Sequence, residues 1–158
     1  MKNTEKLTRI ASFTVNHDYI VPGMYISRID GDITTYDLRF RRPNCDSFMD
    51  NATMHSIEHL FATYVRNSEI GGRVIYFGPM GCQTGFYLLI RDAEHTESYN
   101  TVLSILEKIL DHTGDMPGAS RIECGNYKNL DLSAAKRECR DYLEALRRGG
   151  PVFEYPTE

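Results

Sequence analysis

Two histidines and a glutamate lie close together in the segment His55-Ser56-Ile57-Glu58-His59. No glycine or proline occurs in residues 51–70, so the segment is predicted to be helical. Helical residues four apart point about 40° from each other, a separation at which two imidazoles can share one metal ion. Glu58 lies beside them and can act as an acid or base without being a ligand. The alternative is a surface helix with two incidental histidines, but this order among only 5 histidines favours a metal site.

A second group of chemical interest is the set of 4 cysteines. Cys82 lies between Gly81 and Gln83 in residues 78–85, where three glycines and a proline predict a tight turn with exposed N–H groups. A structural cysteine is more typical of an apolar run, so we interpret Cys82 as a reactive thiol. Cys124 lies in a predicted loop and could supply a third, thiolate ligand to the histidines. Cys139 lies within the last predicted helix and is predicted to be a packing residue.

The composition of the whole chain limits the classes of function. The 158 residues are 41% hydrophobic and carry a net charge of −4, which predicts one domain, residues 1–158, with its own core. An acidic balance argues against nucleic acid as a partner. We expect no membrane span, because the longest clean apolar run is residues 86–90, and no secretory signal. A cytoplasmic protein with free thiols is therefore expected.

The elements that must position these residues follow from local patterns. Alternation and turn residues predict strands at 24–29, 33–41, 73–77 and 86–91, the first two joined by the hairpin turn 30–32. Helices are predicted at 51–67, with Asn51 or Thr53 as N-cap, at 94–112, and from 132 or 133 to 148, with Ser133 as N-cap. Residues 12–17 are predicted to be an extended arm. Without regular β-α-β alternation, the fold class is α+β, a largely antiparallel sheet packed against helices.

Two further polar side chains stand out on these elements. Arg39 shares one face of its strand with Asp37 and Arg41, where it is either an exposed charge or a clamp for a carboxylate. His17 lies in a turn-like setting between Asn16 and Asp18, which is more typical of a surface residue. Neither pattern assigns a function by itself.

Taken together, the motifs resemble the S-ribosylhomocysteine lyase family, whose members act in methyl-cycle detoxification and autoinducer-2 synthesis. The matching segments occur in the family's order over nearly the whole chain, and they are Ser12-Phe13…His17, Asp37-Leu38-Arg39-Phe40, His55-Ser56-Ile57-Glu58-His59-Leu60, Gly78-Pro79-Met80-Gly81-Cys82-Gln83-Thr84-Gly85-Phe86-Tyr87 and Cys124-Gly125-Asn126-Tyr127. The combination is far more specific than the histidine motif alone.

The resemblance implies one divalent metal ion per subunit. His55, His59 and Cys124 are its implied ligands, with water or substrate at an open position. Ferrous iron is the metal implied in the cell, and zinc is often found in purified members of the family. The resemblance also implies a homodimer with two active sites at the subunit interface.

The reaction implied by the resemblance converts S-ribosylhomocysteine to homocysteine and 4,5-dihydroxy-2,3-pentanedione, the autoinducer-2 precursor. Two isomerisations shift the carbonyl along the ribose, and β-elimination follows. The implied catalytic residues are Cys82 and Glu58. Ser12, His17 and Arg39 match positions that hold the homocysteine end of the substrate, partly from the neighbouring subunit.

Two alternative functions use the same histidine motif. An inverted-motif zinc metallopeptidase would take its third ligand from a downstream glutamate and would leave Cys82 without a role. A non-enzymatic metal-binding module would close the site with a fourth ligand.

Overall fold

An antiparallel sheet is the frame of the molecule in a computed structural model, which describes residues 7–45 and 47–158. Within these residues the sheet has four strands in the order β1-β2-β4-β3. Each neighbouring pair is antiparallel. The strands are β1 (Gly23–Asp30), β2 (Ile33–Arg39), β3 (Val74–Pro79) and β4 (Gly85–Arg91). The inner position of β4 fits its nearly continuous apolar sequence.

The predicted hairpin turn joins β1 to β2. Asp30 pairs with Ile33, and Gly31 between them has φ +60°, a conformation that costs glycine least. The hairpin fixes the register of β2, so Tyr36 and Leu38 point to one face of the sheet and Asp37 and Arg39 to the other. All four side chains are buried, which means that both faces are covered at this point of the sheet.

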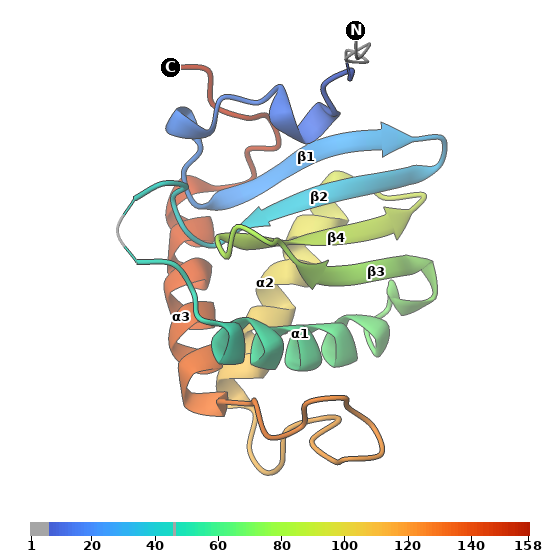
Figure 1. The fold of residues 1–158 in the computed structure, drawn as a ribbon. Helices are drawn as coiled ribbons and strands as arrows, with labels where there is room; N and C mark the ends of the chain where they lie inside the picture. Colours follow the sequence, from blue (N-terminus) through green and yellow to red (C-terminus); the bar gives the residue numbers. More distant parts are fainter. Residues whose placement is uncertain (1–6, 46) are drawn as a thin grey trace, which may run out of the picture.

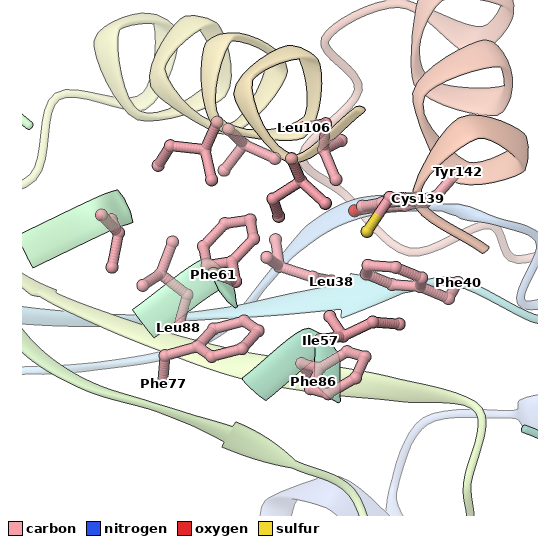
Figure 2. Close-up of a cluster of buried hydrophobic side chains, with 14 of the residues drawn as sticks. Leu38, Phe40, Ile57, Phe61, Phe77, Phe86, Leu88, Leu106, Cys139 and Tyr142 are labelled. Carbon is pink, nitrogen blue, oxygen red and sulfur yellow. The ribbon is translucent and has the colours of Figure 1, made fainter. Parts of the chain in front are cut away.

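Helices cover one face of the sheet, as Figure 1 shows. They are α1 (Asn51–Arg66), α2 (His95–Asp111) and α3 (Leu132–Gly149). Phe61 of α1, Leu106 of α2 and Tyr142 of α3 meet Leu38 and Leu88 of the sheet in a buried cluster (Figure 2). Burying a side chain of this size contributes about 1.5–3 kcal/mol. The predicted α+β class is confirmed, and the core holds α1 in a fixed orientation against the sheet.

The caps of α1 and α3 differ from the prediction. The carboxylate of Asp50 accepts the N–H of Thr53 at 2.8 Å, so Asp50, rather than Asn51 or Thr53, is the N-cap of α1. Asp131 in the same way accepts the N–H of Ala134 at 2.9 Å, and caps α3 in place of Ser133. In each case an aspartate lies directly before the helix and satisfies an N–H that has no intrahelical acceptor.

The N-terminal segment is not the extended arm that alternation predicted. It forms short 3-10 helices at Ala11–Phe13 and His17–Tyr19. The side chain of Asn16 accepts the N–H of Asp18 at 3.0 Å, and this local bond competes with an extended backbone. No helix within residues 7–45 and 47–158 is long and apolar enough to span a membrane.

Candidate metal centre and adjoining cavity

Three possible ligands, two imidazoles and one thiol, meet at α1. His55 and His59 are on adjacent turns of the helix, and Cys124 comes from the loop between α2 and α3. The ligand atoms of the three residues all lie within 4.8 Å of one another, and His55 Nε2 is 3.4 Å from Cys124 Sγ. The two imidazole rings are 4.5 Å apart and nearly perpendicular, at 87°. The sequence placed both histidines on one face, and the fold adds Cys124 to them.

Backbone carbonyls orient both imidazoles. His55 Nδ1 is 2.8 Å from the carbonyl oxygen of Asn129, and His59 Nδ1 is 2.7 Å from that of Pro117. A carbonyl oxygen only accepts hydrogen bonds, so each Nδ1 carries the proton and each Nε2 keeps its lone pair. Histidines that bind metals are commonly held by a second hydrogen bond of this kind.

Glycine is required where the loop passes His59. Gly118 has φ +68°, and a Cβ at this position would lie 3.0 Å from His59 Nδ1. A larger side chain would therefore strain the backbone and push against the imidazole. The loop that carries Cys124 thus also fixes the position of His59.

The donor set fits a metal ion with an open coordination position. With bonds of about 2.0 Å to nitrogen and 2.3 Å to sulfur, two nitrogens and one sulfur in a tetrahedral site lie roughly 3.3–3.5 Å apart. His55 Nε2 and Cys124 Sγ, 3.4 Å apart, already have this spacing, and all three ligand atoms lie within 4.8 Å of one another. Three protein ligands leave a fourth position free, as in catalytic rather than structural sites. No carboxylate of the described residues joins the group, so the third ligand that a metallopeptidase of this motif needs is missing.

A cavity of about 420 Å³ lies beside the histidines, a size suited to a small molecule. His55 and Glu58 of α1 line one side, and Pro79, Gly81 and Gln83, the neighbours of Cys82, line another. Asn126 and Asn129 extend the lining toward the loop that carries Cys124. Glu58 is half-buried in this lining, so its carboxylate is available to a bound molecule.

Cys82 is exposed at the tip of the turn between β3 and β4. The N–H of Gln83 donates to the carbonyl of Met80 at 3.0 Å, which closes the turn. Gln83 has φ +63°, an unfavourable conformation for a residue with a side chain. Backbone strain of this kind is concentrated at functional sites, and here it lies directly beside Cys82.

A chain of hydrogen bonds runs from Cys82 into the sheet. Cys82 Sγ lies 3.0 Å from Thr84 Oγ1, and Arg39 Nη1 donates to the same oxygen at 3.0 Å. Arg39 also binds Asp37 through Nε at 3.0 Å and through Nη2 at 2.5 Å. Because the guanidinium has only donors, Thr84 must accept from Arg39, and its own proton is left to donate to the sulfur.

Arg39 therefore has a setting that differs from an exposed charge. It is 3% exposed, and its partner Asp37 is fully buried. Burial disfavours the charge of Arg39, but hydrogen bonding and the charge of Asp37, with a contribution from Cys82, raise the pKa of the guanidinium above its ordinary value. The cation is thus permanent and stands directly behind the turn that carries Cys82.

Ser12 and His17 lie elsewhere in the single chain. Ser12 lines a second cavity of about 280 Å³, together with Tyr76 and Tyr87 on the other face of the sheet. His17 Nδ1 is 2.9 Å from the carbonyl oxygen of Val15. Neither residue lines the cavity beside the histidines. One chain brings together the two histidines, Cys124, Glu58 and the Cys82 turn, and leaves Ser12 and His17 outside.

Sequence reasoning missed several residues around the site. Asp37 and Thr84 carried a usable signal, since one shares a strand face with Arg39 and the other follows Cys82 by two positions. The carbonyls of Pro117 and Asn129 carried none, because every residue has a carbonyl group.

The fold and this cluster define an α+β protein with a candidate metal centre of two imidazoles and one thiolate.

Comparison with known proteins agrees with this description. Residues 10–149 match the family model of S-ribosylhomocysteinase (LuxS). The chain is 44% identical over 146 residues to an S-ribosylhomocysteine lyase of Clostridium beijerinckii, covering 89% of this chain and 92% of the relative. It is 42% identical over 146 residues to one of Borreliella burgdorferi, with 89% and 93% covered, and 43% identical over 145 residues to one of Finegoldia magna, with 89% and 92% covered. The chain belongs to the S-ribosylhomocysteinase (LuxS) family.

Proposed function

We propose that the protein is a metal-dependent S-ribosylhomocysteine lyase that releases homocysteine and 4,5-dihydroxy-2,3-pentanedione, the precursor of autoinducer-2. The observation that carries this proposal is the meeting of His55, His59 and Cys124 beside a cavity that Glu58 and the Cys82 turn also line. A metallopeptidase would need a carboxylate ligand, and none of the described residues supplies one to this group.

His55, His59 and Cys124 are the proposed ligands of one divalent ion, ferrous iron in the cell with zinc as a substitute in purified protein. Two imidazoles and a thiolate suit either metal. When bound, the ion supplies Lewis-acid polarisation of the sugar oxygens. Both Nε2 lone pairs are ready for this role because the Nδ1 protons are held by backbone carbonyls.

Cys82 is the proposed proton carrier of the isomerisations. Its thiolate accepts a proton from the carbon beside the carbonyl and, as a thiol, returns it to the former carbonyl carbon. The hydroxyl proton of the first carbon passes to the former carbonyl oxygen, so the carbonyl shifts by one position. The hydroxyl of Thr84, 3.0 Å from Sγ, donates to the thiolate form, and Arg39 polarises that hydroxyl. The exposed sulfur can approach the substrate without any movement of the core.

Glu58 is the proposed second acid and base. After the second isomerisation, its carboxylate takes a proton from the carbon beside the carbonyl, the C–S bond breaks with its electron pair, and homocysteine leaves as the thiol once protonated. Glu58 lies on α1 between the two histidines, so the helix holds its distance from the metal ligands constant.

We further propose a homodimer in which Ser12 and His17 complete the site of the neighbouring subunit. Arg39 is buried and bound to Asp37 and Thr84, so its proposed part in binding the homocysteine carboxylate is that of a nearby positive charge. In its own chain Ser12 lies on the sheet face opposite the core, beside a small apolar cavity. The side chains of Phe13, Ile29 and Tyr76 are 64%, 58% and 51% exposed. A second copy packed against them would bury this apolar surface. The whole chain would then act as a single domain of that dimer.

The proposed location is the cytoplasm. Cys45, Cys82, Cys124 and Cys139 are all free thiols, which suits a reducing compartment. The proposed use of Cys82 and Cys124 also requires them to stay reduced.

A substitution of Cys124 tests the function against the peptidase alternative. Cys124→Ala removes one of three ligands, so we expect metal content and homocysteine release to fall together. Metal is measured by elemental analysis and homocysteine by a thiol reagent, with Cys45→Ala as the matched control that keeps both. Retained metal together with cleavage of a peptide substrate would refute the lyase.

A further inference from the structure

The C-terminal residues of the described chain lie along the edge of the sheet. This tail, residues 150–158, lies beyond the part matched by the family model, which ends at residue 149. It leaves α3 at Gly150, whose φ of +71° ends the helix, and it passes alongside β1 (Figure 1). The N–H of Ile26 donates to the carbonyl of Phe153 at 2.8 Å, so the tail is hydrogen-bonded to the edge strand.

Side chains on either side of this bond hold the tail in place. The Phe153 ring lies 5.4 Å from that of His95 and 6.3 Å from that of Tyr99, both on α2. Two residues later, Tyr155 stacks on Tyr25 with ring centroids 4.9 Å apart. Tyr25 is 3% exposed and pairs with Asp37 in the strand register. Tyr155 therefore lies over the face of the sheet that carries Asp37, away from the helices.

The hydroxyl of Tyr155 reaches the buried ion pair behind the Cys82 turn. It donates to Asp37 Oδ2 at 2.7 Å, the same oxygen that binds Arg39 Nη2. Burial, followed by the negative charge of Asp37, raises the pKa of the Tyr155 phenol, so the group keeps its proton and acts as a donor. The path from Tyr155 to Cys82 then runs through Asp37, Arg39 and Thr84 without a break.

We propose that Tyr155 is a positioning residue that favours the thiolate of Cys82 through Asp37, Arg39 and Thr84, an inference that rests on the proposed role of Cys82 as a proton carrier. The hydrogen bond from Tyr155 withdraws electron density from the Asp37 carboxylate. Arg39 is then less neutralised by its partner and polarises the Thr84 hydroxyl more strongly. That hydroxyl donates to the sulfur, so its gain in strength stabilises the negative form.

Other titratable groups also lie around the Cys82 turn. Arg39 and Asp37 come from β2, and Tyr87 comes from β4. His55 and Glu58 of α1 face the turn across the cavity. Removal of the Tyr155 hydroxyl leaves all of these groups in place, so it tests the contact of Tyr155 with Asp37 alone.

The test is the pH dependence of Cys82 alkylation in the metal-loaded, full-length protein. Iodoacetamide modifies the thiolate, and trypsin releases residues 74–91, a peptide whose single cysteine is Cys82, for mass spectrometry. Tyr155→Phe should move the midpoint of the alkylation curve upward by about half a pH unit, or 0.7 kcal/mol. Tyr25→Phe is the matched control, because it removes a neighbouring hydroxyl that donates to the Val21 carbonyl and should leave the midpoint unchanged.

Two results would overturn the proposal: a Tyr155→Phe curve that superimposes on the wild-type curve, or equal shifts in both variants. Should Tyr155→Phe fail to fold, a fluorinated tyrosine at position 155 replaces it. This residue keeps the shape and is a stronger donor, so the midpoint should move downward, and an unchanged or raised midpoint refutes the role of Tyr155. The alkylation curve does not depend on turnover, so it separates the two proposals. The midpoint can shift in a protein without lyase activity, and it can stay unchanged in a protein that is an active lyase.

Discussion

At the scale of single residues, the two nitrogens of each imidazole in the centre have separate tasks. The Nδ1 atoms of His55 and His59 donate to the carbonyls of Asn129 and Pro117, which leaves both Nε2 atoms free to bind a metal. His55 Nε2 lies 3.4 Å from Cys124 Sγ. The sequence could place the histidines on one face, because helix periodicity is local. It could not place Cys124, since the approach of two segments 69 residues apart depends on the packing of the whole core.

Glu58→Gln tests the proposed acid and base role of Glu58. Glutamine keeps the shape but cannot accept a proton, so homocysteine release should fall by roughly 10²–10⁴-fold. Metal content should not change, because Glu58 is outside the ligand group. With ¹³C-labelled substrate, NMR should detect a ketone intermediate that accumulates.

Glu69→Gln is the control for this substitution, since Glu69 is exposed and lines a different groove. It should release homocysteine at the wild-type rate. Full release by Glu58→Gln, or loss of its metal, would remove Glu58 from the proposed mechanism.

At the scale of elements, α1 and the Cys82 turn reach the cavity from two sides. Stacking of Phe61 on Phe77, with ring centroids 4.3 Å apart, fixes α1 against β3 just before that strand enters the turn. Ser56 adds a second link, because its hydroxyl accepts the N–H of Asp131 at 2.6 Å at the start of α3. The helix with the histidines is thus tied both to the strand before Cys82 and to the helix after Cys124.

Asp50→Ala tests the N-terminus of α1. Hydrogen bonds from Thr53 lower the pKa of the Asp50 carboxyl, so the cap stabilises the folded state above the unfolded pKa, near 4, and this gain is lost as the pH falls through the folded value. The variant should be less stable by about 1 kcal/mol at pH 7. The difference should shrink at pH 3.

Urea unfolding at both pH values measures this difference. Glu144→Ala, on the exposed side of α3, is the control and should stay within about 0.5 kcal/mol of the wild type. An equal loss for Asp50→Ala at pH 7 and pH 3 would mean that the carboxylate is not the cap.

Most elements could be predicted from the sequence, because hydrophobic period and turn residues are local signals. The hairpin at Gly31 and the helix that carries His55 are examples. The caps at Asp50 and Asp131 were missed by one to three positions, since neighbouring polar residues can each fill that role. The contact of Tyr155 with Asp37 had no local signal, because 118 residues separate the two side chains.

At the scale of the whole molecule, Ser12 and His17 lie apart from the other proposed site residues of the same chain. The helix-covered face carries the core, and the opposite face carries Ser12 and exposed aromatic groups such as Tyr76. A second copy packed against that face would bring a further set of side chains to each site. Symmetry then requires two equivalent sites per dimer.

Mixing two inactive variants tests this arrangement. Ser12→Ala and Cys82→Ala each damage both sites of a homodimer, but a mixed dimer regains one intact site if Ser12 serves the partner's Cys82. With equal amounts and random exchange of subunits, the activity should return to about a quarter of wild type. Sites built within one chain would show no recovery, and that outcome would refute the shared site.

Cys82 is proposed to carry protons on a sugar bound beside the metal ligands. The most direct measurement is homocysteine release by Cys82→Ala, purified anaerobically and loaded with ferrous iron. We predict one metal ion per chain as in the wild type, an unchanged circular dichroism spectrum, and a loss of release of roughly 10²–10⁴-fold. Release of homocysteine by this variant at the wild-type rate would rule out Cys82 as the proton carrier.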